Sequence, residues 1–140
     1  MAVRVAINGF GRIGRLVLRA AIESGRDDIE FVGINDLGPV ETNAHLLKYD
    51  SVHGVLDAEV TTGDDWMDAG RGKMKVTAER DPTKLPWKEL GVDIALECTG
   101  IFTKREQAAL HLKAGARKVL TSAPAGDADF MIVYGVNHKV

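Results

Sequence analysis

The hydrophobic residues of this chain gather in short, nearly continuous runs, each bounded by glycine, proline or polar residues. Runs without a regular alternation of apolar and polar residues are typical of strands buried on both faces. They predict strands at residues 3–7, 29–34, 73–78, 92–98, 118–121 and 130–134.

Stretches with helical spacing lie between these strands and predict helices at residues 12–24, 43–49 and 104–114. The side chains expected to face the core are Ile13, Leu16, Val17 and Ala20 in the first helix and Ala108, Ala109 and Leu112 in the third. Gly25 and Gly115 follow these two helices, where glycine commonly ends a helix. Residues 51–72 are rich in glycine and acidic side chains, so we expect short strands and loops there, with weak β signals around residues 55–60.

Buried strands that alternate with helices predict a doubly wound α/β fold, with a mainly parallel sheet covered on both faces. Such sheets bind ligands at the carboxyl ends of their strands. The segments that end predicted strands are Asn8 to Gly11, Asn35-Asp36, Thr99-Gly100 and Ser122. We therefore expect these distant segments to lie in one neighbourhood.

A glycine motif, Gly9-Phe10-Gly11-Arg12-Ile13-Gly14, joins the first predicted strand to the first helix. This spacing is the phosphate-binding turn of a Rossmann-type, dinucleotide-binding domain. Gly9 permits the tight turn, Gly11 lets the backbone approach a diphosphate, and Gly14 lets the helix pack closely on the strand. The helix would then present its unpaired N–H groups to the phosphates. The alternative is a tight turn that binds no ligand.

Asp36 follows about 20 residues after the motif, where an acidic residue hydrogen-bonds the adenosine ribose. Its charge would repel the extra phosphate of NADP, so the sequence predicts NAD as the cofactor. The alternative is that Asp36 only caps a turn before Gly38. Arg12 lies at a helix start that disfavours cations, so a nearby diphosphate is its expected partner, with the backbone N–H of Ile13 beside it.

Arg15 and Arg19 continue the first helix at helical spacing. We expect them on a solvated face or at a subunit contact. Arg80 follows a predicted strand, and the pattern alone leaves open whether it binds a ligand or forms a surface ion pair.

The composition indicates one domain of 140 residues with mixed charges and a net charge of −2. No basic block suggests a nucleic acid, and no segment is long enough to span a membrane. The start of the chain does not resemble a signal peptide. One cysteine suits a reducing compartment, so we expect a cytoplasmic location.

Catalytic and metal-binding side chains are not evident from spacing. Cys98 ends a predicted strand beside an acidic residue, so we interpret this thiol as structural rather than as a nucleophile. His45 and His53 are expected on the surface or in loops. No Cys, His and Asp cluster has the spacing of metal ligands, and we predict no metal.

Several phrases together resemble one family, that of phosphorylating glyceraldehyde-3-phosphate dehydrogenase, in its amino-terminal NAD-binding half. They are Ile7 to Arg15, Ile34-Asn35-Asp36, Tyr49 to Gly54, Glu79-Arg80-Asp81-Pro82, Glu97 to Thr103, Ser122-Ala123-Pro124 and Tyr134 to Asn137. The resemblance runs from about residue 2 to residue 140.

The resemblance implies roles that spacing could not supply. Residues matching Arg12 and Ile13 contact the diphosphate, and those matching Asn35 and Asp36 hold the adenosine ribose. Residues that line the adenine and nicotinamide-ribose stretch match Arg80, Thr99, Gly100, Phe102 and Ser122. The family oxidises a phosphorylated aldehyde through a thiohemiacetal on a cysteine and passes hydride to NAD. Inorganic phosphate then attacks and releases the product as an acyl phosphate. It usually forms homotetramers.

The family's nucleophile lies in a Ser-Cys-Thr-Thr-Asn motif that residues 1–140 do not contain. We therefore expect a cofactor domain at residues 1–140 that binds NAD without turnover, the catalytic domain being absent. We expect binding of the aldehyde phosphate and inorganic phosphate, and assembly into a homo-oligomer, only for the full-length protein. The alternatives are a related erythrose-4-phosphate dehydrogenase and a non-catalytic NAD-binding module.

Overall fold

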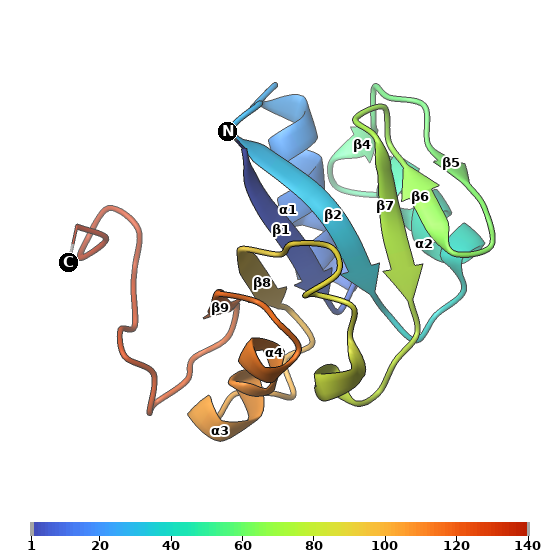
Figure 1. Cartoon of the computed structure of the whole chain (residues 1–140). Coiled ribbons are helices and arrows are strands. Elements are labelled where there is room, and N and C mark those ends of the chain that lie inside the picture. The colour runs from blue at the N-terminus through green and yellow to red at the C-terminus, as the bar shows by residue number, and fades with distance from the viewer. Residues whose placement is uncertain (1, 140) are drawn as a thin grey trace.

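The computed structural model describes residues 2–139, and its centre is a seven-stranded sheet with the strand order β5-β6-β7-β2-β1-β8-β9 (Figure 1). The strands of this sheet are β1 (Val3–Asn8), β2 (Ile29–Asn35), β5 (Thr61–Thr62), β6 (Trp66–Asp68), β7 (Lys73–Thr77), β8 (Ile94–Glu97) and β9 (Lys118–Thr121). The five strands from β7 to β9 in this order are parallel, and β5 and β6 add an antiparallel edge. The predicted mainly parallel α/β sheet is thus confirmed.

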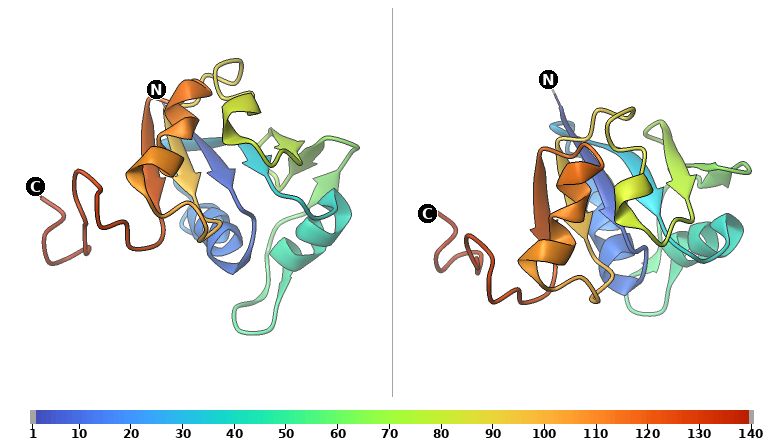
Figure 2. Two further views of the ribbon diagram at one scale, coloured as in Figure 1. Left: turned by 90° about the horizontal axis from the view of Figure 1, so that it is seen from below. Right: turned by 60° about the horizontal axis from the view of Figure 1, so that its bottom comes forward.

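Helices cover both faces of this sheet (Figure 2). Helices α1 (Arg12–Glu23) and α2 (Val40–Lys48) lie on one face, and the short helices η1 (Pro82–Lys84), α3 (Arg105–Ala108) and α4 (Leu110–Lys113) lie on the other. A two-stranded hairpin of β3 (Tyr49–Asp50) and β4 (Gly54–Val55) follows α2. The short strands between residues 51 and 72 agree with the predicted mixture of strands and loops.

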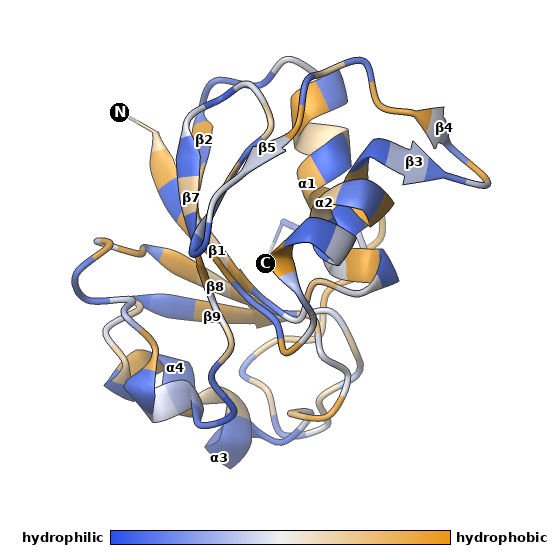
Figure 3. Ribbon diagram, turned by 90° about the vertical axis from the view of Figure 1, so that its right-hand side faces the viewer, coloured by the Kyte–Doolittle hydropathy of each residue, from blue (hydrophilic) through white to orange (hydrophobic). Residues whose placement is uncertain are grey.

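Each side of the sheet has its own apolar core, because successive strand residues point to opposite faces. Ile7 of β1 belongs to the core beneath α1 and α2, together with Phe10 and Ile34. Ala6, its neighbour, belongs to the other core, around the fully buried Trp87. Figure 3 shows apolar residues along the central strands and mixed stripes on the helices.

The side chains of α1 that face the core are not those that the sequence predicts. Gly14, Leu18 and Ala21 face the core, whereas Ile13 is 52% exposed and Val17 is 36% exposed. A Cβ atom at residue 14 would lie 2.2 Å from the carbonyl oxygen of Gly9. The glycine therefore allows this side of the helix to approach the strand, and Ile13 and Val17 are turned outward.

The predicted helix at 104–114 is divided into α3 and α4, joined at Ala109. Ala108 is buried as expected, but Leu112 is 46% exposed and His111 is fully buried in its place. The polar partners of His111, described below, explain this reversal.

The strand predicted at residues 130–134 is not formed. This segment extends away from the body of the fold, and Phe130 and Tyr134 are exposed (Figure 1). A strand needs a partner for its backbone groups. Among residues 2–139 none pairs with it, and the backbone of Val133 instead bonds to Asn137 in a local turn.

Candidate functional site

The carboxyl ends of the parallel strands form one row of polar residues. Asn8 ends β1 and pairs in register with Asn35 of β2 on one side and with Glu97 of β8 on the other. Asn35 is in turn level with Thr77 of β7, and Glu97 with Thr121 of β9. The structure thus brings together the strand ends that the sequence predicts as one neighbourhood.

The glycine motif forms a tight turn between β1 and α1. Gly9 has φ +93°, and a Cβ atom there would lie 2.7 Å from the backbone nitrogen of Thr99. Gly14 packs against the carbonyl of Gly9, as described for the fold. A Cβ atom on Gly11 would meet nothing within 4 Å, so this position faces open space. A ligand can therefore approach the backbone at Gly11.

The first turn of α1 offers unpaired backbone donors toward this open space. The helix has no side-chain cap and no acidic residue in its first turn. Within residues 2–139, no acceptor is found for the backbone N–H groups of Arg12, Ile13 or Gly14. Such donors, together with the positive end of the helix dipole, fit a phosphate or diphosphate.

Arg12 lies at this helix end with its side chain 47% exposed. Its Nη1 atom lies 3.3 Å from Oδ2 of Asp50, whose side chain is only 6% exposed. The other carboxylate oxygen of Asp50 accepts from the backbone N–H groups of Val52 and His53, each at 2.8 Å. These backbone bonds, and then the charge of Arg12, lower the pKa of Asp50 to about 2.

We expect Asp50→Asn to lower the melting temperature at pH 7, because the ionised carboxylate bonds better in the folded state. Since the folded pKa of about 2 lies below the ordinary 3.8, this stabilisation is complete above about pH 4. It should disappear as the pH falls through 2. Thermal unfolding of both proteins between pH 2 and pH 7 measures the difference, with the exposed Asp57→Asn as the control. A difference that grows toward acid would contradict this assignment.

Asp36 lies at the end of β2, beside the glycine turn. Its Oδ1 atom accepts from the backbone N–H of Phe10, and its Oδ2 atom accepts from the N–H of Gly38 and from Asn43, all at 3.0 Å. The bond from Gly38 that caps the turn is therefore present, as the alternative interpretation of Asp36 expects. The bond from Phe10 shows that the carboxylate also holds the glycine turn. A carboxylate offers about four acceptor positions, so one remains for a ribose hydroxyl.

Asn35, the preceding residue, is buried and uses its whole side chain within the protein. Its Nδ2 donates to Asn8 Oδ1 and to the carbonyl of Glu79, each at 2.8 Å. Its Oδ1 accepts from Thr77 and from the backbone N–H of Glu79. Asn35 thus fixes the ends of β1, β2 and β7.

The other candidate residues lie on loops along the same edge. Arg80 is exposed after β7, and no ion-pair partner is found for it in the described chain. Gly100 is exposed with φ +79°, and Phe102 is half-buried further along that loop. The backbone N–H and the hydroxyl of Ser122 both donate to the carbonyl of Glu97. Loop positions alone do not assign them a ligand.

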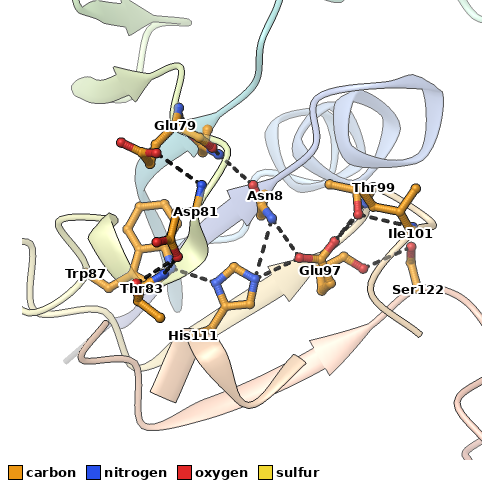
Figure 4. A network of polar contacts seen from close by, with 11 residues as sticks. Asn8, Glu79, Asp81, Thr83, Trp87, Glu97, Thr99, Ile101, His111 and Ser122 are labelled. Carbon is orange, nitrogen blue, oxygen red and sulfur yellow. Dashed lines mark hydrogen bonds and ion pairs between the residues drawn. The ribbon is translucent and has the colours of Figure 1, made fainter. Parts of the chain in front are cut away.

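A buried polar cluster beneath these loops was missed by the sequence analysis (Figure 4). Glu97 and His111 are 2% and 0% exposed, and Oε1 of Glu97 lies 2.7 Å from Nε2 of His111. The same oxygen accepts from Asn8 Nδ2 at 2.6 Å, and Trp87 Nε1 lies 3.0 Å from His111 Nδ1. An ionisable residue within the apolar run 92–98 was the available signal.

Arg19, expected on a solvated face or at a subunit contact, is instead buried within the fold. Its guanidinium donates to the carbonyls of His53 and Gly54 at 2.9 Å and to Glu23. It therefore anchors the β3–β4 hairpin to α1. Arg15 is half-buried and donates to the carbonyl of Phe10.

Cys98 does not have the surroundings of a nucleophile. Burial raises the pKa of its thiol, and the neighbouring charge of Glu97 raises it further. This favours the structural interpretation. His45 and His53 are exposed as predicted, and no group of three metal-ligating side chains is found within residues 2–139. None of the helices in that range is both long and apolar enough for a membrane span.

Comparison with known proteins places these features in one family. Residues 3–105 match the family model described as glyceraldehyde 3-phosphate dehydrogenase, NAD binding domain. Relatives named glyceraldehyde-3-phosphate dehydrogenase are 70% identical over 139 residues in Xanthobacter flavus and 69% identical over 138 residues in Cereibacter sphaeroides. Each alignment covers 99% of this chain but only 42% and 41% of the relative, so the chain spans less than half of their length.

Proposed function

The chain belongs to the glyceraldehyde 3-phosphate dehydrogenase family through its NAD-binding domain, and we propose that residues 1–140 form one domain that binds NAD across the row of strand ends. The observation that carries this proposal is the first turn of α1. The N–H groups of Arg12, Ile13 and Gly14 have no acceptor in the described part of the chain, and Gly11 beside them faces open space. That arrangement suits the diphosphate of the cofactor.

The strand order supports one direction for the proposed extended cofactor. Asp36 follows β2, the glycine turn follows β1, and Thr99 follows β8 on the far side of β1. The adenosine ribose would bind at Asp36, the diphosphate at Arg12 and Ile13, and the other half of the dinucleotide beside Thr99 and Gly100. Loop residues along this edge complete the proposed contacts, namely Arg80, Phe102 and Ser122. Asn35 would act indirectly, by fixing the strand end that carries Asp36.

The activity of a longer protein is a separate part of the proposal. The name of the relatives supports oxidation of glyceraldehyde 3-phosphate. Inorganic phosphate as the second substrate is implied only by the family resemblance. NAD, when bound, would accept the hydride. We assign no catalytic residue to this chain, because the Cys98 thiol is partly buried beside a carboxylate and has a raised pKa.

A homotetramer in the cytoplasm completes this proposal. The outward face of α1, with Ile13 and Val17, and the exposed Val52 and Val55 of the hairpin supply apolar surface for a subunit contact. A single cysteine suits a reducing compartment.

Amide spectra of the labelled chain test the cofactor site directly. On titration with NAD, we expect the amide signals of Arg12, Ile13 and Gly14 to move, because their N–H groups would bond to phosphate. Signals of Ala21 and Glu23, at the other end of α1, serve as the internal control. No change at millimolar NAD, or changes confined to that other end, would overturn the proposal.

A further inference from the structure

The carboxylate of Glu97 joins two loops of the proposed cofactor site, with one oxygen for each loop. Oε1 accepts from Asn8, the residue before the glycine turn, and from His111. Oε2 accepts from the backbone N–H of Thr99 at 3.0 Å and from its hydroxyl. Figure 4 shows Glu97 between Asn8 and Thr99, with His111 and then Trp87 to its left.

Trp87 determines how His111 bonds to this carboxylate. An indole N–H can only donate, so Nδ1 of His111 is the acceptor of the bond from Trp87. In the neutral ring the other nitrogen, Nε2, then carries the proton and donates to Glu97. Four donors converge on a carboxylate side chain that is 1% exposed. Burial alone would raise the pKa of Glu97, but the hydrogen bonds from His111, Thr99 and Asn8 lower it.

The bonds to Thr99 also set the distance between the two loops. A Cβ atom on Gly9 would lie 2.7 Å from Thr99 N and 2.8 Å from its Cγ2 atom, so the two loops are in close contact. Because Glu97 holds both the N–H and the hydroxyl of Thr99, it fixes which atoms of Thr99 press against Gly9. A rotation of Thr99 would displace the glycine turn or Gly100.

We propose that Glu97 is a positioning residue that holds the loop of Thr99 and Gly100 against the glycine turn, and so sets affinity for the part of the dinucleotide beyond the diphosphate. This inference rests on the proposed NAD site. Asp36 lies on the other side of β1, and no bond links its carboxylate directly to Glu97. Glu97 should therefore influence one half of the cofactor and not the other.

Titration of Glu97→Gln with NAD and with AMP separates these halves. A glutamine must present an NH₂ group to donors of one loop, and a buried donor is then left without an acceptor, which is costly. We expect NAD to bind about 10-fold to 100-fold more weakly, and AMP to bind within about twofold of the original affinity. Glu89→Gln makes the same chemical change at an exposed position and should alter neither affinity.

A second variant keeps the test valid if Glu97→Gln does not fold. Thr99→Val keeps the shape of the side chain and removes only the hydroxyl that donates to Glu97. It should weaken NAD by about 5-fold to 10-fold, with AMP unchanged. Equal losses for NAD and AMP in a folded variant would show a merely structural role and overturn the inference, as would unchanged NAD affinity. If the original chain bound no NAD, the proposed function itself would fail, together with the inference that rests on it.

Discussion

The chain is expected to bind NAD several hundredfold more tightly than NADP, because in the proposed site the additional phosphate would lie beside the carboxylate of Asp36. Hydrogen bonds from Phe10, Gly38 and Asn43 fix that carboxylate in place, so it cannot easily turn away. Two like charges about 4 Å apart at an effective dielectric near 20 repel by roughly 4 kcal/mol. Calorimetric titration with each dinucleotide measures the ratio of affinities.

Asp36→Asn provides the matched variant for this measurement. An asparagine oxygen can still accept from one of the present donors, and the charge is lost. The ratio of the NAD and NADP affinities should fall by at least tenfold, even if both dinucleotides bind more weakly. Asp57→Asn, an equal charge change at an exposed position, should leave the ratio unchanged. Equal affinity for the two cofactors in the original chain would refute the role of Asp36.

Alanine at Gly11 and alanine at Gly14 should both weaken NAD binding but should differ in their effect on stability, although the two glycines belong to one motif. A methyl group at residue 14 would lie 2.2 Å from the backbone oxygen of Gly9, which no side-chain movement can relieve. We expect Gly14→Ala to lower the free energy of unfolding by about 3 kcal/mol, since overpacking of this kind typically costs 1–3 kcal/mol and occasionally more. NAD affinity should fall with it, because the helix moves away from the turn.

Gly11→Ala should leave the stability of the chain almost unchanged. Its φ is −75°, and a Cβ atom there meets no other atom. The methyl group would occupy the space through which a diphosphate reaches the N–H groups of α1, so we expect NAD binding to be lost at concentrations that saturate the original chain. Denaturant unfolding and NAD titration of both variants separate the two effects. An unstable Gly11→Ala, or one that binds NAD normally, would contradict this account.

Local sequence patterns were sufficient for the parallel strands of the sheet and for the glycine turn, but they also predicted a strand at residues 130–134 that is not formed. The apolar runs that form β1, β2, β7, β8 and β9 show their length and burial directly in consecutive residues. The spacing of the three glycines likewise predicts the turn that they form. The orientation of α1 was not accessible in this way. It depends on contact between Gly14 and a carbonyl of the preceding turn, which outweighs the larger apolar area of Ile13 and Val17.

Buried polar partners were the other feature beyond the reach of sequence patterns. His111 occupies a position that hydropathy gives to an apolar residue, because Glu97 and Trp87 satisfy its two ring nitrogens. Those partners come from separate elements, so their spacing along the chain carries no signal. The loops of the candidate site could be predicted from the sequence, because parallel strands place their carboxyl ends together whatever their distance along the chain.

The cluster around Glu97 makes the stability contributions of its members depend on one another. One negative charge is kept in the protein interior by neutral dipoles alone, and its four hydrogen bonds come from Asn8, His111 and Thr99. Removing any one donor leaves that charge short of solvation, whereas replacing the whole group by apolar side chains removes the need for donors. We therefore expect the four positions to be energetically coupled, so that a single substitution costs more stability than a joint replacement by apolar side chains.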